Sequence, residues 1–108
     1  VTRGDGVWID LGSGRGSEAA ERRPCIVVSN DANNRAASTV TVVPCTTNVH
    51  AVYPFEVYLE DVLSRPSKAQ AQQVRTVDQR RIVTPPVARL GPILANRVDD
   101  ALRLHLAL

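Results

Sequence analysis

Short apolar segments separated by polar, glycine-containing or proline-containing turns constrain this chain more than any other feature. Apolar and polar residues alternate over Val7–Leu11, Val40–Cys45 and Phe55–Glu60, which is typical of β-strands, and the last of these is expected to keep one wet face. The run Cys25–Ser29 is expected to be a strand buried on both faces. These segments and a helix beginning at Pro92 predict a mainly β fold, a small antiparallel barrel or curled sheet with a C-terminal α-helix.

The segment between residues 61 and 81 has no clear periodicity. Ser64–Lys68 is expected to be a loop, and Ala69–Val74 fits either a strand or a helix, with Ala and Gln favouring the helix. Arg75–Asp78 ends that element, with Asp78 placed to cap a short turn over Gln79–Arg81. Val87–Leu90 is expected to be a short last strand.

Two helical segments are expected. Asn30–Arg35 fits a turn or one short helical turn, capped by Asp31. In the C-terminal helix, Asp99 and Arg103 are spaced to pair on the wet side. That helix also carries an apolar stripe and further leucines, which suggest a subunit interface: Leu94, Val98, Ala101, Leu102 and His105 in the stripe, and Leu104, Leu106 and Leu108 beside it.

Composition narrows the class of protein. A chain of 108 residues with 44% hydrophobic residues suits one domain, residues 1–108. No apolar run approaches the length of a membrane span, and residues 1–6 lack the apolar core of a signal peptide, so a soluble cytoplasmic protein is expected. Cys25 and Cys45 lie in apolar surroundings without metal-ligand spacing, and we expect two small buried hydrophobic side chains.

The basic residues point weakly toward phosphate. Twelve of the 13 basic residues are arginines and the net charge is only +2, and a GC-rich genome would explain the arginine bias. The pair Arg22-Arg23, however, stands directly before the strand that opens at Pro24. Guanidinium offers a rigid fork of donors that fits phosphate oxygens, so the pair suggests a phosphodiester site. The alternative is that Arg23 merely pairs with Glu18 or Glu21.

An ordered set of short motifs resembles the MazF/PemK toxin family from residue 3 to the C-terminus. The motifs are Arg3-Gly4-Asp5, Val7-Trp8-Ile9-Asp10-Leu11, Gly16-Ser17-Glu18, Arg23-Pro24, Val27-Val28-Ser29-Asn30-Asp31, Asn34-Arg35, Val42-Val43-Pro44, Gln73-Val74-Arg75-Thr76-Val77-Asp78 and Val98-Asp99-Asp100-Ala101-Leu102.

The resemblance implies an SH3-like barrel that forms a homodimer, with an RNA groove across the subunit interface. Members cleave single-stranded RNA at short sequences, without a metal or other cofactor. A cognate antitoxin inhibits them by laying an extended segment over the groove. The target could be messenger, ribosomal or transfer RNA. The same barrel occurs in gyrase-directed poisons, which form the alternative, but those end in a tryptophan-containing tail, whereas the only tryptophan here is Trp8.

The chromosomal MazF branch assigns the chemistry to an arginine before the strand-opening proline and a threonine after the third strand, which correspond to Arg23 and Thr46. The plasmid-borne branch uses a His, Arg and Asp group, and the matching positions, Ser17, Gln70 and Gln72, cannot replace it. The chain is therefore expected to follow the Arg/Thr scheme.

In that scheme RNA supplies its own nucleophile, because the ribose 2′-oxygen attacks the adjacent phosphorus and leaves a 2′,3′-cyclic phosphate and a 5′-hydroxyl. Arg23 would stabilise charge on the phosphate, and Thr46 would bond to a phosphate oxygen or to the attacking hydroxyl. The resemblance further suggests RNA contacts from Ser17, Glu18, Asn30, Asn34, Arg35, Thr47 and Gln73. For three of these positions an alternative remains: Asn30 and Asn34 would form a turn, and Glu18 would be a solvated loop residue.

Overall fold

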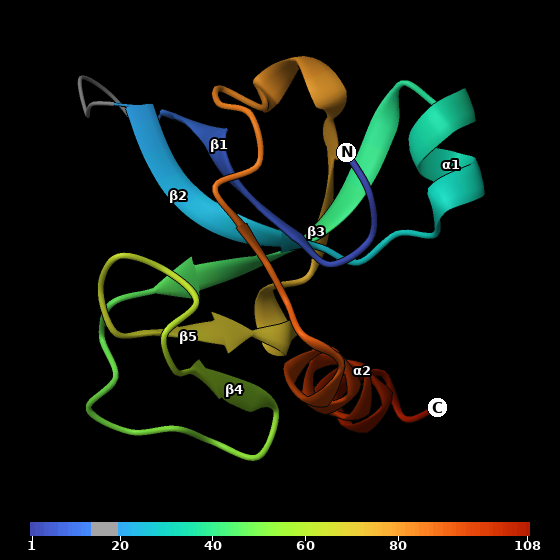
Figure 1. Ribbon diagram of the computed structural model, residues 1–108. Coiled ribbons are helices and arrows are strands. Elements are labelled where there is room, and N and C mark those ends of the chain that lie inside the picture. The colour runs from blue at the N-terminus through green and yellow to red at the C-terminus, as the bar shows by residue number, and fades with distance from the viewer. Residues whose placement is uncertain (14–19) are drawn as a thin grey trace.

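The computed structural model describes residues 1–13 and 20–108 (Figure 1). Its strands are β1 (Asp5–Ser13), β2 (Ala20–Val27), β3 (Thr39–Thr46), β4 (Glu56–Leu59), β5 (Ser67–Gln70), β6 (Arg75–Asp78) and β7 (Ala88–Arg89). The helices are α1 (Asp31–Ala36) and α2 (Pro92–Leu106), and two 3₁₀ turns are η1 (Ala71–Gln73) and η2 (Gln79–Arg81). A curled antiparallel sheet with a C-terminal helix confirms the predicted fold class.

The strands form one sheet in the order β4-β5-β3-β2-β1-β7, and β6 also pairs with β3. Every pairing is antiparallel. Strand β3 pairs with β6 through Val42 and with β5 from Cys45 onward. The two ladders on this side of β3 therefore part at Val43 and Pro44. Pro44 stands where β3 changes partner.

Side-chain alternation along β2 and β3 gives the sheet two apolar faces. On one face, Cys25, Val27, Val40 and Val42 pack with residues of β1 and β6. On the other, Ile26, Val43 and Cys45 pack with β4, β5 and α2. Both cores contain mostly Val, Leu, Ile and Ala, as the low aromatic content requires. In Figure 1, α2 accordingly lies beside β4 and β5, away from β1.

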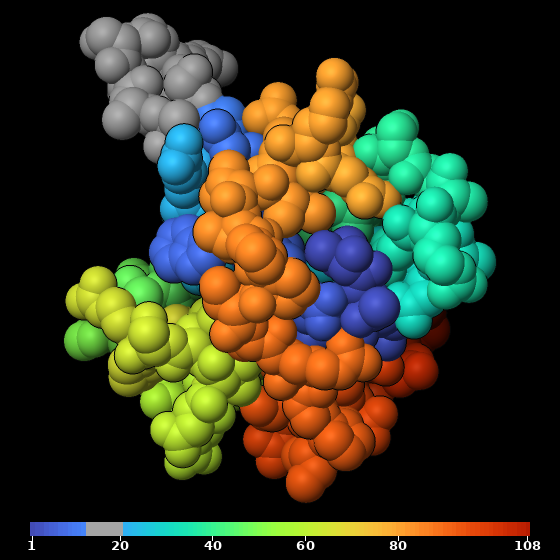
Figure 2. All heavy atoms as spheres, turned by 45° about the horizontal axis from the view of Figure 1, so that its top comes forward, coloured from blue at the N-terminus to red at the C-terminus, as the bar shows by residue number. Residues whose placement is uncertain are grey.

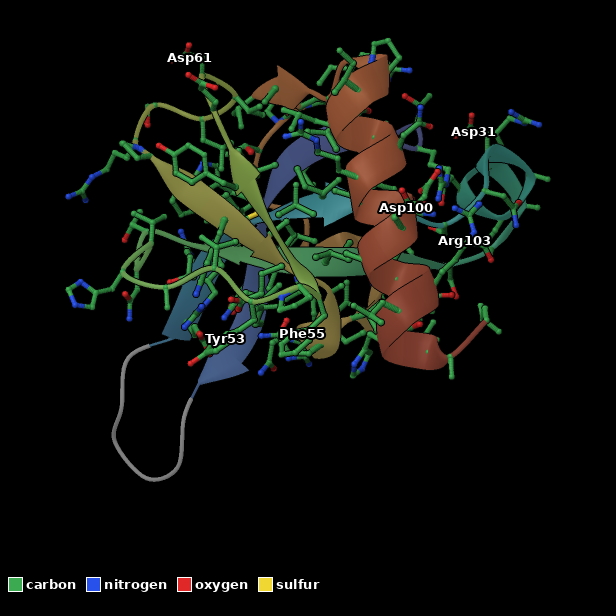
Figure 3. All side chains as sticks on the ribbon, turned by 90° about the horizontal axis from the view of Figure 1, so that it is seen from below. Asp31, Tyr53, Phe55, Asp61, Asp100 and Arg103 are labelled. Atoms are coloured by element: carbon green, nitrogen blue, oxygen red, sulfur yellow. The ribbon has the colours of Figure 1, made fainter. Side chains whose placement is uncertain are left out.

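Helix α2 begins where the sequence predicts, with Gly91 at the N-cap and Pro92 in the first turn. The predicted Asp99–Arg103 pair is wrong. Arg103 Nη1 instead lies 2.9 Å from Asp100 Oδ1, on the outward side of the helix (Figure 3). Asp99 Oδ1 accepts a hydrogen bond of 2.7 Å from Arg3 Nη2 and so ties α2 to the chain before β1.

The predicted caps are confirmed in one case and corrected in the other. Asp78 caps η2, because its Oδ1 accepts from the Arg80 amide at 2.8 Å. The short helix α1 forms as expected, but its cap is Asn30, whose Oδ1 accepts from the Asn33 amide at 2.8 Å. Asp31 accepts instead from the Arg3 amide at 2.7 Å and thereby fixes the start of the chain against α1.

The segment after residue 60 departs most from the prediction. Ser67–Gln70 forms β5, although Ser64–Lys68 was expected to be a loop and the Ala/Gln-rich stretch to lean toward a helix. Arg75–Asp78 forms a further strand, β6, on β3. Pairing with β3 decides both elements, because tertiary contacts readily override helix propensity. No helix in the described part of the chain is long and apolar enough to cross a bilayer.

Candidate active site at the open end of the β2–β3 pair

Arg23 and Thr46 are brought together by strand register. Cys25 lies opposite Pro44 in the β2–β3 pair, and continuing this antiparallel register by two residues places Arg23 opposite Thr46. A step of two residues keeps both side chains on the face of Cys25 and Pro44. The two residues predicted to be catalytic therefore share one face where β2 starts and β3 ends. In Figure 1 this end of the sheet lies opposite α1.

A polar hollow of about 340 Å³ opens on this face. It includes the point where β3 parts from its neighbours, since Pro44 contributes to its wall. Arg23 and Thr46 line it together with Leu11, Glu21, Asn48, Lys68, Gln70, Gln73 and Arg75. Three cationic side chains and three amides suit a phosphate and the polar edges of nucleobases.

A second, more apolar hollow of about 580 Å³ also has Arg23 and Thr46 in its lining. Its wall comes from β1, the segment 63–67 and Val87, and Figure 2 shows these parts of the chain meeting on one face of the molecule. Trp8, which is 38% exposed, offers a ring on which a base could stack. Thr47 and Arg65 bring polar groups to the same wall.

The side chain of Arg23 is already paired within β2. Its Nε donates a hydrogen bond to Glu21 Oε1, so the alternative foreseen from the sequence, a pair with Glu21, is present. The two side chains are 38% and 49% exposed, and they remain open to solvent. The pair engages Nε of the guanidinium, and Nη1 and Nη2 donate no hydrogen bond to the residues that the structure describes.

Sequence reasoning missed an ion pair beside the hollow. Lys68 Nζ lies 2.9 Å from Glu56 Oε1 and 2.6 Å from the Ala51 carbonyl oxygen, and both charged side chains are buried. Glu56 was expected on the wet face of its strand. This expectation is wrong, because the Glu56 side chain is buried and pairs with the Lys68 ammonium group. The sole lysine of the sequence was the one signal for this pair.

Hydrogen bonds decide the protonation state of Glu56. Burial alone would raise the pKa of this carboxyl, but donors from Lys68, the Tyr53 amide, Gln72 and Gln70 outweigh it and lower the pKa to about 2. Tyr53 and Phe55 stack beside this cluster with ring centres 5.7 Å apart (Figure 3). The carboxylate is therefore ionised at neutral pH and fixes Lys68 in the wall of the hollow.

The residues predicted to bind RNA fall into three groups. Gln73 lines the polar hollow and Thr47 lines the more apolar one. Asn30, Asn34 and Arg35 belong to α1, away from these hollows, where Asn30 caps the helix and Asn34 is buried. Ser17 and Glu18 lie outside the described residues. Their RNA contacts all stay predictions.

Both cysteines are buried and free, as expected. Burial raises the pKa of the Cys25 thiol to about 12 despite the nearby Arg23 and Arg75, and it raises the pKa of Cys45 as well. Neither thiol is therefore a ready nucleophile. Within residues 1–13 and 20–108, no group of three His, Cys, Asp or Glu side chains is placed to hold a metal ion.

Comparison with known proteins assigns the chain to a family. Residues 2–106 match the family described as "PemK-like, MazF-like toxin of type II toxin-antitoxin system". The chain belongs to the PemK/MazF toxin family. The resemblance read from the ordered motifs is thereby confirmed.

Named relatives extend over the whole chain. Endoribonuclease MazF9 of Mycobacterium tuberculosis is 41% identical over 100% of this chain and 98% of its own length. Endoribonuclease EndoA of Bacillus subtilis is 34% identical over 100% of this chain and 96% of its own. A solved mycobacterial endoribonuclease in complex with its cognate antitoxin has a TM-score of 0.84 at 25% identity, covering 100% of this chain and 96% of that one.

Proposed function

We propose that the chain is a metal-independent, sequence-specific endoribonuclease toxin that cleaves single-stranded RNA. The observation that supports this most is that Arg23 and Thr46, from two paired strands, line the same solvent-open polar hollow. The relatives, which match the full length of the chain, are named endoribonucleases. Family membership and site geometry thus favour the same reaction.

The chemistry follows from what these side chains can do. Arg23 contacts the scissile phosphate through its terminal nitrogens and stabilises negative charge that grows on the nonbridging oxygens. Thr46 positions the attacking ribose or the phosphate through its hydroxyl, which in the free protein accepts a 3.2 Å hydrogen bond from the Asn48 amide. The 2′-oxygen is the nucleophile, so the products are a 2′,3′-cyclic phosphate and a 5′-hydroxyl. A fixed guanidinium supplies the charge that a metal ion would otherwise supply.

The partners proposed are a second copy of the chain and a cognate antitoxin protein. Several relatives of known structure were solved with an antitoxin. Apolar side chains left exposed on α2 suit a subunit contact: Ile93, Leu104 and Leu106. We place the encounter with cellular RNA and antitoxin in the cytoplasm.

Cleavage of a short RNA in excess EDTA tests the proposal. We expect unmodified RNA to be cut into fragments that carry 2′,3′-cyclic phosphate and 5′-hydroxyl ends, identified by mass spectrometry. The same RNA with a single 2′-deoxy sugar at the cleavage position should bind and remain whole. Cutting of the deoxy substrate at the full rate would contradict the internal nucleophile. Intact RNA in every condition would favour a protein-directed poison instead.

A further inference from the structure

The proposed reaction requires a group that accepts the proton of the 2′-hydroxyl. Arg23 cannot do so, because a guanidinium stays protonated and carries only donors. Thr46 has a neutral hydroxyl, which is a poor acceptor for a proton of this kind. Lys68 is committed to Glu56 and to the Ala51 carbonyl. The acceptor must therefore be sought among the other side chains of the two hollows.

Glu21 is the only carboxylate that lines either hollow in the described part of the chain. It stands two residues before Arg23 on β2, so alternation puts both side chains on the face that carries Thr46. Its side chain is 49% exposed, which leaves the carboxylate open to a bound substrate. Arg23 Nε donates a hydrogen bond to one oxygen of this carboxylate, Oε1, and Oε2 receives no hydrogen bond from the residues that the structure describes.

The Arg23–Glu21 bond leaves room for a phosphate on the same guanidinium. Glu21 Oε1 takes the hydrogen of Nε, whereas Nη1 and Nη2 donate no hydrogen bond to the residues that the structure describes. A phosphate held by the terminal nitrogens would lie at one edge of a planar group whose neighbouring edge carries the carboxylate. The ribose that bears the attacking hydroxyl is bonded to that phosphate, which brings its 2′-oxygen toward Glu21.

We propose that Glu21 is the general base of RNA cleavage. Its carboxylate takes the proton from the 2′-hydroxyl while the 2′-oxygen forms a bond to phosphorus. The bond between phosphorus and the 5′-oxygen breaks, and the departing oxygen takes a proton from water. Glu21 then returns its proton to water, so the step consumes no other reactant. This inference rests on the proposed function and adds a catalytic residue to it.

An alternative role for Glu21, neutralising Arg23 without taking a proton, predicts the opposite change in cleavage rate when the carboxylate is removed. If the carboxylate merely neutralised Arg23, it would compete with the phosphate, and removing its charge would strengthen RNA binding and leave cleavage equal or faster. A general base contributes about 10²- to 10⁴-fold to the rate, so its loss slows cleavage even when RNA is saturating. The two roles therefore differ in the sign of the change in rate.

Single-turnover cleavage at saturating RNA, measured as a function of pH, tests the inference with Glu21→Gln and Glu21→Ala. We expect both variants to cleave at least about 100-fold more slowly. They should also lose the decline in rate that protonation of the base causes in the wild type at acid pH. The charged groups that share the hollow with Glu21 are Arg23 on β2, Lys68 on β5 and Arg75 on β6.

The matched control is Glu60→Gln, because Glu60 is an exposed carboxylate directly after β4 that lines neither hollow. It should cleave as the wild type does. Circular dichroism and thermal unfolding should show that all variants fold, as expected for exposed positions. The RNA with a 2′-deoxy sugar measures binding separately, and its affinity for Glu21→Gln should equal or exceed that for the wild type.

Two outcomes would overturn the assignment of Glu21: cleavage by Glu21→Gln at the wild-type rate or faster, or an unchanged acid limb in the pH profile of that variant. Either result leaves the proposed function standing if the wild type still produces cyclic phosphate ends. Failure of the wild type to cut RNA, or products with other ends, would instead remove the proposed function itself.

Discussion

Lys68 Nζ lies 2.9 Å from Glu56 Oε1, and the two side chains are only 8% and 1% exposed. Glu56 Oε2 also accepts hydrogen bonds from Gln72 at 2.7 Å and Gln70 at 3.3 Å. The cluster joins β4, β5, η1 and, through the Ala51 carbonyl, the loop that follows β3. It therefore fixes one wall of the candidate site to the core that β4, β5 and α2 form with one face of the sheet.

Replacing Lys68 should destabilise the fold strongly. Lys68→Met leaves the Glu56 carboxylate buried without its counter-ion, which typically costs about 3–5 kcal/mol of unfolding free energy. Urea denaturation measures this change. The double variant Lys68→Met with Glu56→Leu is the control, because replacing both partners with apolar groups should recover most of the loss. A single variant as stable as the wild type would show that the pair contributes nothing.

The same cluster should make stability depend on pH in the acid range. The pKa of Glu56 is lowered from 4.5 to about 2 in the folded protein. The folded state therefore holds its proton less tightly than the unfolded state, and the stabilisation, on the order of 3 kcal/mol, is complete above pH 4.5. It is lost as the pH falls from there through about 2. Unfolding free energies of the wild type and Glu56→Gln across this range should differ in slope.

Arg23 and Thr46 should be required for cleavage and dispensable for folding. Arg23→Ala is expected to lower the cleavage rate about 10²- to 10³-fold, which is the usual cost of losing a charge-stabilising donor. Arg23→Lys should recover only part, because a point charge cannot form the planar fork. Thr46→Val should lose activity and Thr46→Ser should keep most of it, since only the hydroxyl is proposed to act.

The control for these variants is Arg97→Ala. Arg97 is an exposed arginine on α2 that lines neither hollow, so its loss changes the net charge equally without touching the site. Rates at saturating RNA separate an effect on chemistry from a general loss of electrostatic attraction. If Arg97→Ala slowed cleavage as much as Arg23→Ala, the special role of Arg23 would be contradicted.

The thiols should be inert while the protein is folded. Because burial raises the pKa of Cys25 to about 12 and raises that of Cys45 too, iodoacetamide at neutral pH should label neither residue. Both should react in denaturant, as mass spectrometry would show. Rapid labelling of the native protein would mean that the β2–β3 core opens far more often than its packing indicates.

Asn34 should support the fold through its buried side chain. Its Nδ2 donates to the Ser29 carbonyl at 2.9 Å, and its Oδ1 accepts from Ser29 Oγ at 2.5 Å. Asn34→Ala should cost about 1–3 kcal/mol in thermal or chemical unfolding, because Ser29 loses its partners. Measuring RNA affinity of the folded variant would test separately the contact that the family resemblance suggests. The exposed neighbour Arg35 provides the comparison, through Arg35→Ala.

The local sequence pattern predicted strands correctly where one face of the strand is apolar. The alternation at Val7–Leu11 and Val40–Cys45 predicted β1 and β3, and Gly91-Pro92 predicted the start of α2. The strand Ser67–Gln70 was missed because its sequence, Ser-Lys-Ala-Gln, has little β propensity, and pairing with β3 and β4 supplies what propensity lacks.

The candidate site was predictable only in part, for a related reason. Arg23 and Thr46 could be named from the family resemblance, and strand register brings them together. The contributions of Lys68, Gln70 and Asn48 to the hollow depend on pairings between distant segments that no local pattern reveals. Glu56 shows the same limit, because a charged residue in an alternating strand reads as exposed until its buried partner is known.

The change of partner along β3 at Pro44 has a consequence for how members of such a family could diversify. The width of the hollow is set by the backbone, because it opens where the ladders to β6 and β5 part. Substitutions at Asn48 or Gln73 would then alter which bases are preferred without reshaping the cleft. New sequence preferences could arise one side chain at a time while the scaffold and its stability are inherited intact.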